Sequence, residues 1–502
     1  MRKKKDIKDN YINDEYPDGI ENDVSAQGAG AFEKPRRIEI ILVGIFFSLL
    51  CIAMIANMCI YIKRDSQEAI NNSYNPRQEL LASQNIRGRI YSRDMDILAY
   101  TKVEDDKSER RVYPYGRLFS HVVGYSTKGK TGVEAAENMN MIFSHDSLGN
   151  KISNELSEVK NWGDNIVTTL DADFQQAASD ALGVYSGAVI LSEPSTGKIL
   201  AMVSKPDYDP NEIADIWEKL INDKDSSVLL NRATQGLYPP GSTFKIVTAL
   251  DYYRENGGDV SGYSYNCNGK FSYEGSLIRC YHGSVHGKEN LKKSFAKSCN
   301  SSFANIGTSL ETASLRKTCD DLMFNSPIST KMAYNQSNFA LKENDTTDDK
   351  LQTVIGQGHT QVTPLLMNMI TCAIANDGVC MTPYVVDHIE SAHGNVIKKY
   401  YPKQEKRMMT SEESEFLKDI MTAVVTEGTA TKLKNDDYTA AGKTGSAEFS
   451  SIKEDSHAWF TGFAPAEDPQ VCVTIIVENA GSGGSFAVPI AKRIFDAYFG
   501  VE

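Results

Sequence analysis

The chain contains the run Tyr238-Pro239-Pro240-Gly241-Ser242-Thr243-Phe244-Lys245, and the largely apolar residues 246–250 follow it. The prolines and the glycine end any preceding element, and the apolar residues after them predict a helix. We therefore expect Ser242 at a helix N-terminus, where free backbone N–H groups stabilise negative charge on or near the serine oxygen. Lys245 lies one turn further along the same face, so it is the candidate base that would activate the Ser242 hydroxyl.

A Ser-rich interruption between two helical-looking segments carries a second motif, Ser298-Cys299-Asn300. A hydroxyl and an amide at such an interruption can both face a cleft. Ser298 is the candidate proton relay, and Asn300 is the candidate contact for a substrate amide. Taken alone, the segment is more typical of a helix cap, so its interpretation depends on the other motifs.

A third motif, Lys443-Thr444-Gly445-Ser446, precedes two segments with the pattern of strands, residues 458–464 and 471–477. We expect the motif on a strand beside the cleft, because a strand edge hydrogen-bonds an extended peptide and Gly445 lets that peptide come close. Lys443 and Thr444 would hold a substrate carboxylate. The backbone N–H groups of Ser242 and Ser446 would bind an oxyanion.

The order of the three motifs is more specific than any one of them. Ser-x-x-Lys, Ser-x-Asn and Lys-Thr-Gly in this order are typical of serine acyl-transfer enzymes that recognise penicillins. Each motif also occurs by accident, and a single copy carries little information. The accidental copies begin at Ser157, Ser195, Ser294, Ser314 and Ser450 for the first motif, at Ser73, Ser83 and Ser264 for the second, and at Lys130 for the third.

With these motifs the chain resembles the class B penicillin-binding proteins, the monofunctional D,D-transpeptidases that cross-link peptidoglycan. The resemblance begins at residue 87, is most specific after residue 187 and is weak over residues 100–162. Serine at position 446 replaces the family's more usual threonine, a mild departure because an oxyanion needs only the backbone N–H. Further matching segments are Arg87-Gly88-Arg89-Ile90-Tyr91-Ser92-Arg93-Asp94, Gly187-Ala188-Val189-Ile190, Pro194-Ser195-Thr196-Gly197-Lys198-Ile199-Leu200-Ala201-Met202, Asn231-Arg232-Ala233, Gly356-Gln357-Gly358, Thr363-Pro364-Leu365 and Ala375-Asn376-Asp377-Gly378.

The C-terminal region has strand-like segments near both ends and helical segments between them. This pattern predicts an α+β fold whose sheet joins distant parts of the sequence, with a last helix near residues 489–498 packed on that sheet. By resemblance, this is a serine β-lactamase-like transpeptidase domain with an antiparallel sheet. We expect a disordered cytoplasmic tail at residues 1–37, a transmembrane anchor at 38–63, a pedestal or dimerisation-like domain of short strands and charged turns at 64–160, and the transpeptidase domain at 161–502. The pedestal is too short for a glycosyltransferase domain, so we expect a monofunctional enzyme.

Residues 40–62 are 23 consecutive residues without a charge, flanked by Arg36-Arg37 and Lys63-Arg64. Such a run is long enough to cross a bilayer once, and it is longer than the apolar part of a cleaved signal. The flanking charges nearly balance, but five further basic residues in the first eight favour a cytoplasmic N-terminus. The catalytic part is then extracytoplasmic. The formal net charge of −13 argues against nucleic acid as a partner.

Nine cysteines are present, of which Cys51 and Cys59 lie inside the apolar run. The other seven form no disulfide framework and are mostly expected to be buried free thiols. Cys267 and Cys280 are the exception, because they bracket a Gly-rich polar loop and His282 and His286 follow them. Our first interpretation is a loop disulfide, the second is two free thiols, and the third is a Cys/His zinc site, whose spacing fits no standard finger.

By resemblance, Ser242 would attack the penultimate D-Ala carbonyl of a stem peptide, with Lys245 as base and Ser298 passing the proton to the departing D-Ala. An amine of a neighbouring stem would then take the acyl group, and a β-lactam would be trapped at the first stage. This chemistry needs no cofactor and no metal. The expected partners are stem peptides, β-lactams, the bilayer and other membrane proteins of the cell-wall machinery. Three alternatives stay open: a hydrolase (D,D-carboxypeptidase or β-lactamase), a membrane-bound β-lactam sensor, and a structural role in a division or elongation complex.

Overall fold

The protein is described by a computed structural model over residues 37–64, 76–223, 226–448 and 456–501. The chain divides into two units, Met1–Gln67 and the compact Glu68–Glu502. The tail that was predicted to be disordered lies outside the described residues, apart from its last residue.

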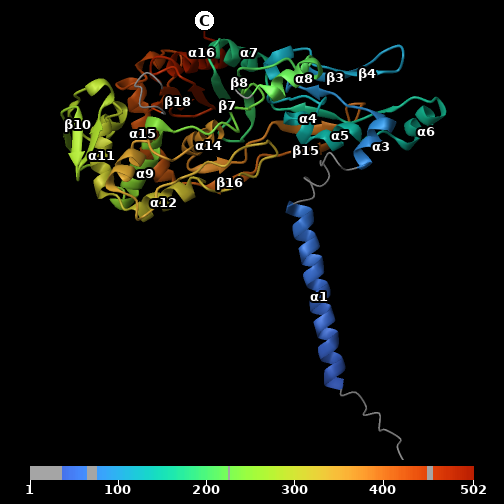
Figure 1. The fold of residues 1–502 in the computed structure, drawn as a ribbon, viewed down its shortest axis with the longest axis horizontal. Coiled ribbons are helices and arrows are strands. Elements are labelled where there is room, and N and C mark those ends of the chain that lie inside the picture. The colour runs from blue at the N-terminus through green and yellow to red at the C-terminus, as the bar shows by residue number, and fades with distance from the viewer. Residues whose placement is uncertain (1–36, 65–75, 224–225, 449–455, 502) are drawn as a thin grey trace, which may run out of the picture. The chain divides into compact units, whose positions relative to one another are not determined.

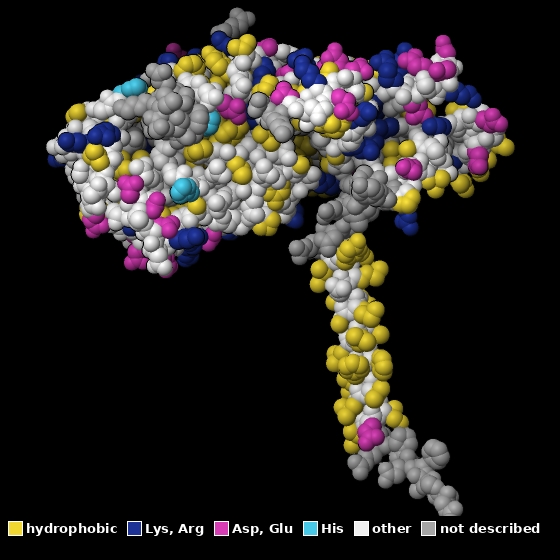
Figure 2. Space-filling view, viewed as in Figure 1, with side chains coloured by type: hydrophobic (Ala, Val, Ile, Leu, Met, Phe, Trp, Pro, Cys, Tyr) yellow, Lys and Arg dark blue, Asp and Glu magenta, His cyan; other side chains and the backbone are white. Residues whose placement is uncertain are grey.

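The described part of the first unit is one helix, α1 (Arg37–Arg64). Its segment Ile38–Ile62 is predominantly apolar and exposed throughout, and its hydrophobic side chains line α1 in Figure 2. At a rise of about 1.5 Å per residue, this segment is about 37 Å long and therefore exceeds the ~30 Å hydrocarbon core of a bilayer. The helix is long and apolar enough to cross a membrane once, and it covers the run that the sequence indicated.

A five-stranded antiparallel sheet forms the centre of the second unit, in the order β17-β18-β19-β7-β8. The predicted strands are confirmed, since β18 (Ser456–Ala464) and β19 (Val471–Val477) contain both segments expected from the sequence. β7 (Gly187–Ser192) and β8 (Ile199–Lys205) come from the other end of the region, where β7 pairs with β19 and β8 pairs with β7. β17 (Ala441–Glu448) carries the Lys-Thr-Gly motif and pairs with β18 alone among the described strands.

Helices cover both faces of this sheet (Figure 1). On one face lies α14 (Pro364–Ala375), of which every residue is buried against β7, β18 and β19. On the other lie α7 (Ala172–Leu182) and α16 (Ala487–Phe499), which pack on each other and on the sheet, as expected for the last helix. Other elements around this core include α8 (Ile213–Asn222), α12 (Thr312–Asp321), α13 (Thr347–Val354), α15 (Ser411–Thr426), and the pair β13 (Val379–Met381) and β16 (Gln404–Arg407).

A second sheet of six strands crosses the predicted boundary at residue 160. Its order is β15-β14-β6-β2-β3-β4, so strands from both sides of the boundary pair with one another. Their bounds are β2 (Ile90–Tyr91), β3 (Ile97–Val103), β4 (Glu109–Val112), β6 (Asn165–Thr168), β14 (Val386–Glu390) and β15 (Val396–Lys399). The division at residue 160 itself stays a prediction.

The pedestal region contains helices as well as the expected strands and turns. They are α3 (Pro76–Gln84), α4 (Gly132–Ala136), α5 (Asn138–Ile142) and α6 (Leu148–Leu156), next to the two-residue pair β1 (Asn85–Ile86) and β5 (Asn161–Trp162). Two of these helices have only five residues, which is too short for a helical repeat to show in the sequence.

A buried ionic group stabilises the pedestal region. Glu134 is fully buried and accepts hydrogen bonds from Nε of Arg87 at 2.6 Å and from Nε of Arg111 at 2.7 Å. It lies on α4, directly after the accidental Lys130-Thr131-Gly132, and Thr131 is the N-cap of this helix. That copy is therefore part of the pedestal's packing.

Candidate active site

Ser242 lies in a tight turn that leads directly into a helix. The turn is the 3-10 segment Gly241–Phe244, and the predicted helix, α9 (Lys245–Glu255), begins at its end. Gly241 donates its N–H to the carbonyl of Gly356 at 2.9 Å. A Cβ at Gly356 would lie 1.7 Å from the Gly241 oxygen, so only glycine allows the loop after α13 to support this turn.

Lys245 is fully buried and points its amine at Ser242. Its Nζ lies 3.0 Å from Ser242 Oγ, 2.8 Å from the carbonyl oxygen of Ser298 and 2.6 Å from Oδ1 of Asn300. A carbonyl oxygen and an amide oxygen can only accept hydrogen bonds. When the amine is neutral, these two oxygens take its two N–H groups, and its lone pair is left for the Ser242 hydroxyl.

The Ser298-Cys299-Asn300 motif forms the sharp turn between α10 (Leu291–Ala296) and α11 (Asn300–Ser309). Ser298 has φ +55°, a left-handed conformation that costs energy for a residue with a Cβ. Its N–H donates to the Phe295 carbonyl at 3.0 Å, and its own carbonyl accepts from Lys245. Ser298 Oγ lies 3.3 Å from Nζ of Lys245, so the turn presents both of its oxygens to that amine.

The Lys-Thr-Gly motif completes the site from β17. Lys443 is fully buried, and its Nζ donates to Ser298 Oγ at 2.9 Å and to the Thr444 carbonyl at 2.9 Å. Thr444 Oγ1 forms a 2.6 Å hydrogen bond with Thr429 Oγ1. A Cβ at Gly241 would lie 2.7 Å from the carbonyl oxygen of Ser446, so β17 packs directly against the Ser242 turn.

Burial sets the protonation of the two lysines. It lowers the pKa of Lys245 to about 8, against the opposing effects of Cys299, Cys280 and Glu289. Burial, together with the charge of Lys245, also lowers the pKa of Lys443 well below its ordinary value. A neutral amine beside a serine hydroxyl near neutral pH is the arrangement that activates a serine nucleophile.

The structure brings all eight predicted site residues to one place, and it gives some of them different contacts from those expected. Asn300 was expected to hold a substrate amide, but its Oδ1 accepts from Lys245 and its Nδ2 donates to the Arg279 carbonyl at 3.0 Å. Lys443 reaches Ser298, and its contact with a substrate carboxylate stays a prediction. The binding of an oxyanion by the N–H groups of Ser242 and Ser446 also stays a prediction.

The loop-disulfide interpretation of Cys267 and Cys280 is wrong in this structure. Both are free thiols, and their Sγ atoms lie 3.7 Å apart because they converge on a third thiol, Cys299. His286 approaches the same group, whereas His282 is exposed. The hydrogen bond with Cys299, and less strongly the one with His286, lowers the pKa of the Cys280 thiol against the opposing effect of burial.

These four residues are the group within the described residues whose side chains could jointly hold a metal ion. The sequence analysis missed Cys299, which it assigned only to the catalytic motif. A cysteine inside the catalytic motif was the one sequence signal for this role. Cys299 lies 19 residues after Cys280, however, and that separation matches no standard metal-ligand spacing.

Comparisons with known proteins agree with this geometry. The penicillin binding protein transpeptidase domain matches residues 187–496, and the penicillin binding protein A dimerisation domain matches residues 87–166. The peptidoglycan D,D-transpeptidase PbpA of Mycolicibacterium smegmatis is 32% identical over 435 residues, which cover 80% of this chain and 87% of that protein. Stage V sporulation protein D of Bacillus subtilis is 28% identical over 76% of this chain and 63% of its own length.

Solved structures give the same assignment. The penicillin G acyl-enzyme complex of penicillin-binding protein A from M. tuberculosis matches with a TM-score of 0.75 and 30% identity, covering 82% of this chain and 99% of that one. The D,D-transpeptidase domain of a peptidoglycan glycosyltransferase from Eggerthella lenta matches with a TM-score of 0.75 and 30% identity, covering 83% and 99%. The chain therefore belongs to the penicillin-binding protein transpeptidase family.

Proposed function

We propose that this chain is a peptidoglycan D,D-transpeptidase that works through an acyl-enzyme on Ser242. The observation that carries the proposal is the buried Lys245 amine, 3.0 Å from Ser242 Oγ and held by Ser298 and Asn300. The names of its relatives and the β-lactam acyl-enzyme complexes of its structural neighbours support the same activity.

In the first step the neutral amine of Lys245 takes the proton of the Ser242 hydroxyl. The Ser242 oxygen then attacks the carbonyl carbon of the penultimate D-Ala, and the N–H groups of Ser242 and Ser446 hold the oxygen that becomes negative. The bond from this carbon to the nitrogen of the terminal D-Ala breaks. The departing nitrogen takes a proton through Ser298, whose Oγ lies within 3.3 Å of Lys245 Nζ and 2.9 Å of Lys443 Nζ.

In the second step an amine of a neighbouring stem attacks the ester carbonyl and regenerates the Ser242 hydroxyl. β17 suits an extended donor peptide, because β18 is its only partner among the strands that the structure describes, which leaves the other edge of β17 for main-chain hydrogen bonds. Thr444 and Lys443 would face the substrate carboxylate at the end of this edge. A β-lactam would stop the cycle after acylation, because its opened ring stays attached and occupies the place of the amine.

The active site acts outside the cytoplasm in this proposal. The apolar helix segment Ile38–Ile62, uncharged from residue 40 onward, would anchor the chain, and the basic residues near the N-terminus favour a cytoplasmic tail. Protease added to cells stripped of their wall should digest the second unit and leave the tail, and digestion of the tail alone would refute this orientation. By family resemblance we also expect contacts with other membrane proteins of the cell-wall machinery, which cross-linking through α1 in native membranes would test.

Covalent labelling tests the nucleophile. The full chain, purified in detergent, is incubated with a fluorescent penicillin and followed over hours by denaturing gel and intact mass. We expect stable label on the wild type and none on Ser242→Ala. The matched control is Ser195→Ala, which removes an exposed serine from an accidental Ser-x-x-Lys and should keep the label. A labelled Ser242→Ala protein would refute the assignment.

The fate of the acyl group separates a transpeptidase from a hydrolase. The enzyme is supplied with uncross-linked glycan strands carrying pentapeptide stems, and the products are digested to muropeptides and measured by mass. Cross-linked dimers with release of one D-Ala each support the proposal. D-Ala release without dimers indicates a D,D-carboxypeptidase, and rapid loss of the penicillin label indicates a β-lactamase.

A further inference from the structure

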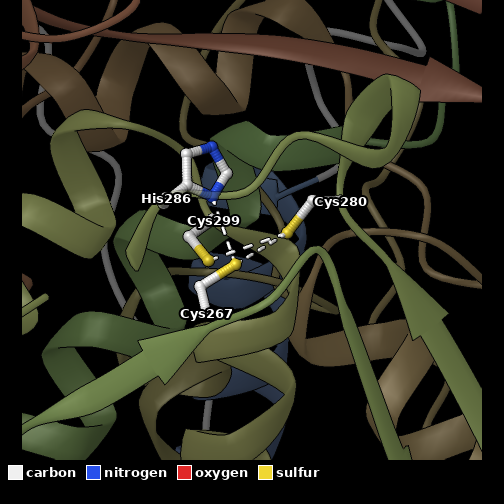
Figure 3. A group of neighbouring side chains, drawn as sticks. All are labelled: Cys267, Cys280, His286 and Cys299. Atoms are coloured by element: carbon white, nitrogen blue, oxygen red, sulfur yellow. Dashed lines mark hydrogen bonds between the residues drawn. The ribbon is translucent and has the colours of Figure 1, made fainter. Parts of the chain in front are cut away.

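Four side chains from four separate segments meet beside the catalytic turn (Figure 3). Cys267 ends β9 (Tyr265–Cys267), and Cys280 follows the hairpin of β10 (Lys270–Tyr273) and β11 (Ser276–Arg279). His286 precedes β12 (Gly287–Glu289), and Cys299 is the N-cap of α11. Their ligand atoms, three Sγ and one imidazole nitrogen, all lie within 4.8 Å of one another.

The spacing of these atoms matches a tetrahedral ligand set. Cys280 Sγ lies 3.7 Å from the Sγ atoms of both Cys267 and Cys299, and Cys267 Sγ lies 3.4 Å from Nδ1 of His286. A tetrahedral zinc site, with Zn–S of about 2.3 Å and Zn–N of about 2.0–2.1 Å, has S···S edges of about 3.8 Å and S···N edges of about 3.6 Å. A disulfide would need an S–S distance of about 2.05 Å, so the observed sulfurs are placed around a common point and not bonded in pairs.

Backbone N–H groups point at all three sulfurs. Each sulfur accepts one backbone N–H: from Gly269 to Cys267 at 3.3 Å, from Ser301 to Cys280 at 3.5 Å, and from Ser302 to Cys299 at 3.4 Å. A metal-bound sulfur is a thiolate and can accept such N–H groups, so these donors suit sulfur ligands of a metal ion. All three cysteines are buried, and a bound cation would balance the negative charge of their sulfurs.

We propose that Cys267, Cys280, His286 and Cys299 bind one Zn²⁺ ion in a closed, tetrahedral, structural site. Three thiolates and one imidazole occupy all four positions, which is typical of structural and not of catalytic zinc. Binding releases the thiol protons and changes no oxidation state, so the step needs no further reactant. The soft sulfur ligands select zinc over Mg²⁺ or Ca²⁺.

The ion would stabilise the segment β9–β12, whose own pairing and packing are limited. The three cysteines form a small buried cluster of their own, with Tyr265 as its partly buried neighbour. Within the described residues, β9 pairs only with β12, and β10 only with β11. Two-stranded pairs of this kind are marginally stable in water, and a metal is a common staple for them.

The site also joins this segment to the catalytic turn. Cys299 stands between Ser298 and Asn300, and the Asn300 amide donates to the carbonyl of Arg279, the residue before Cys280. The ion would therefore fix the backbone that presents the Ser298 carbonyl and the Asn300 side chain to Lys245. This consequence rests on the function proposed above, whereas the metal site itself does not.

Metal analysis of the wild-type chain tests the site without any variant. The full chain, without an affinity tag, is purified under reducing conditions, and its zinc content and X-ray absorption spectrum are measured. We expect one zinc per chain, with three sulfur neighbours at about 2.3 Å and one nitrogen at about 2.0 Å. A protein that neither retains zinc nor takes up added Zn²⁺ or Co²⁺ with thiolate charge-transfer bands would overturn the proposal. So would zinc bound by nitrogen and oxygen alone, or an intact mass showing a disulfide among these cysteines.

Variants locate the ion. Cys267→Ala should lose the zinc, while Cys319→Ala, which removes a buried thiol outside the cluster, should keep one per chain. His286→Cys offers four thiolates and should also keep one zinc ion per chain. This variant therefore tests the ligand assignment even if Cys267→Ala fails to fold. Zinc retained in full by a folded Cys267→Ala protein would contradict the ligand assignment.

The link to the catalytic turn has its own measurement. Removal of zinc by a chelator should slow acylation by penicillin at least tenfold, and added Zn²⁺ should restore the rate. An unchanged acylation rate in protein shown to be metal-free would refute the link.

Discussion

The lowered pKa of Lys245 predicts a steep pH dependence for the acylation of Ser242. The amine must be neutral to take the serine proton, and burial lowers its pKa to about 8. Its neutral fraction is then ~1% at pH 6, ~9% at pH 7, ~50% at pH 8 and ~91% at pH 9. A lysine with an ordinary pKa of about 10.5 would be only ~0.03% neutral at pH 7, so burial raises the reactive fraction at that pH about 300-fold.

The expected profile follows from these fractions. The acylation rate should rise about tenfold from pH 6 to pH 7 and less than twofold from pH 8 to pH 9, because the amine is largely neutral by then. The charged or titratable groups that affect this amine are Glu289, Cys280 and Cys299, and Lys443 lies nearby on β17. The first three favour the protonated amine and oppose the effect of burial, so they limit how far the pKa of Lys245, and with it the midpoint of the pH–rate profile, can fall.

The assay is the second-order rate of labelling by a fluorescent penicillin between pH 6 and pH 9, with the melting temperature recorded at each pH. Lys245→Arg keeps a positive charge but cannot release a proton, and should lower the rate about 10²–10⁴-fold. Lys292→Arg is the control, because that lysine is exposed and pairs with Asp419 on the surface. A rate that does not change between pH 6 and pH 8, or a Lys245→Arg protein that labels normally, would refute Lys245 as the base.

Three further substitutions test the parts of the molecule that support this site. Gly356→Ala places a Cβ 1.7 Å from the Gly241 oxygen and should abolish penicillin labelling, whereas Gly394→Ala has a similar positive φ but open space around it and should label normally. Ser298→Ala should slow acylation about 10²–10⁴-fold in the same rate assay, and a wild-type rate would exclude a proton relay. Glu134→Gln leaves its two arginine partners without a buried countercharge, and should reduce the free energy of urea unfolding by about 3–5 kcal/mol. A loss of unfolding free energy below about 1 kcal/mol would mean that water reaches Glu134 and its two arginine partners, which would contradict their burial.

The sequence predicted the central sheet and the composition of the site well, because both depend on local patterns. The apolar runs at 458–464 and 471–477 and the last helix were confirmed, and the three motifs meet in one place. The tight turn before Lys245 and the Ser-rich break before α11 were also predictable, because local Pro, Gly and Ser residues mark them in the sequence.

The contacts within the site could not be predicted, because they depend on backbone geometry between distant segments. The left-handed φ of Ser298 turns its carbonyl toward Lys245, and no sequence rule assigns that conformation to a serine. The burial of Lys443, which directs its amine to Ser298, follows from the packing of β17 against α15 and of the amine against the Phe295 ring of α10, and not from the motif itself. The second sheet was missed for a similar reason, since β14 pairs with β6 across more than 200 residues.

Because Cys299 belongs to both the catalytic turn and the cysteine cluster, the cluster can hold the conformation of the turn. A left-handed serine persists only when its surroundings hold it, and on one side the hydrogen bonds of Ser298 and Asn300 with Lys245 do so. Those bonds weaken when Lys245 loses its proton, because a neutral amine is a weaker donor than an ammonium group. Support that does not depend on this proton comes from the other side, where Cys299 caps α11 and Asn300 donates to the carbonyl of Arg279. A metal ion that joins Cys299 to Cys280 would reinforce this side without contact with the reacting atoms. The turn could then present the same two oxygens to Lys245 in both of its protonation states.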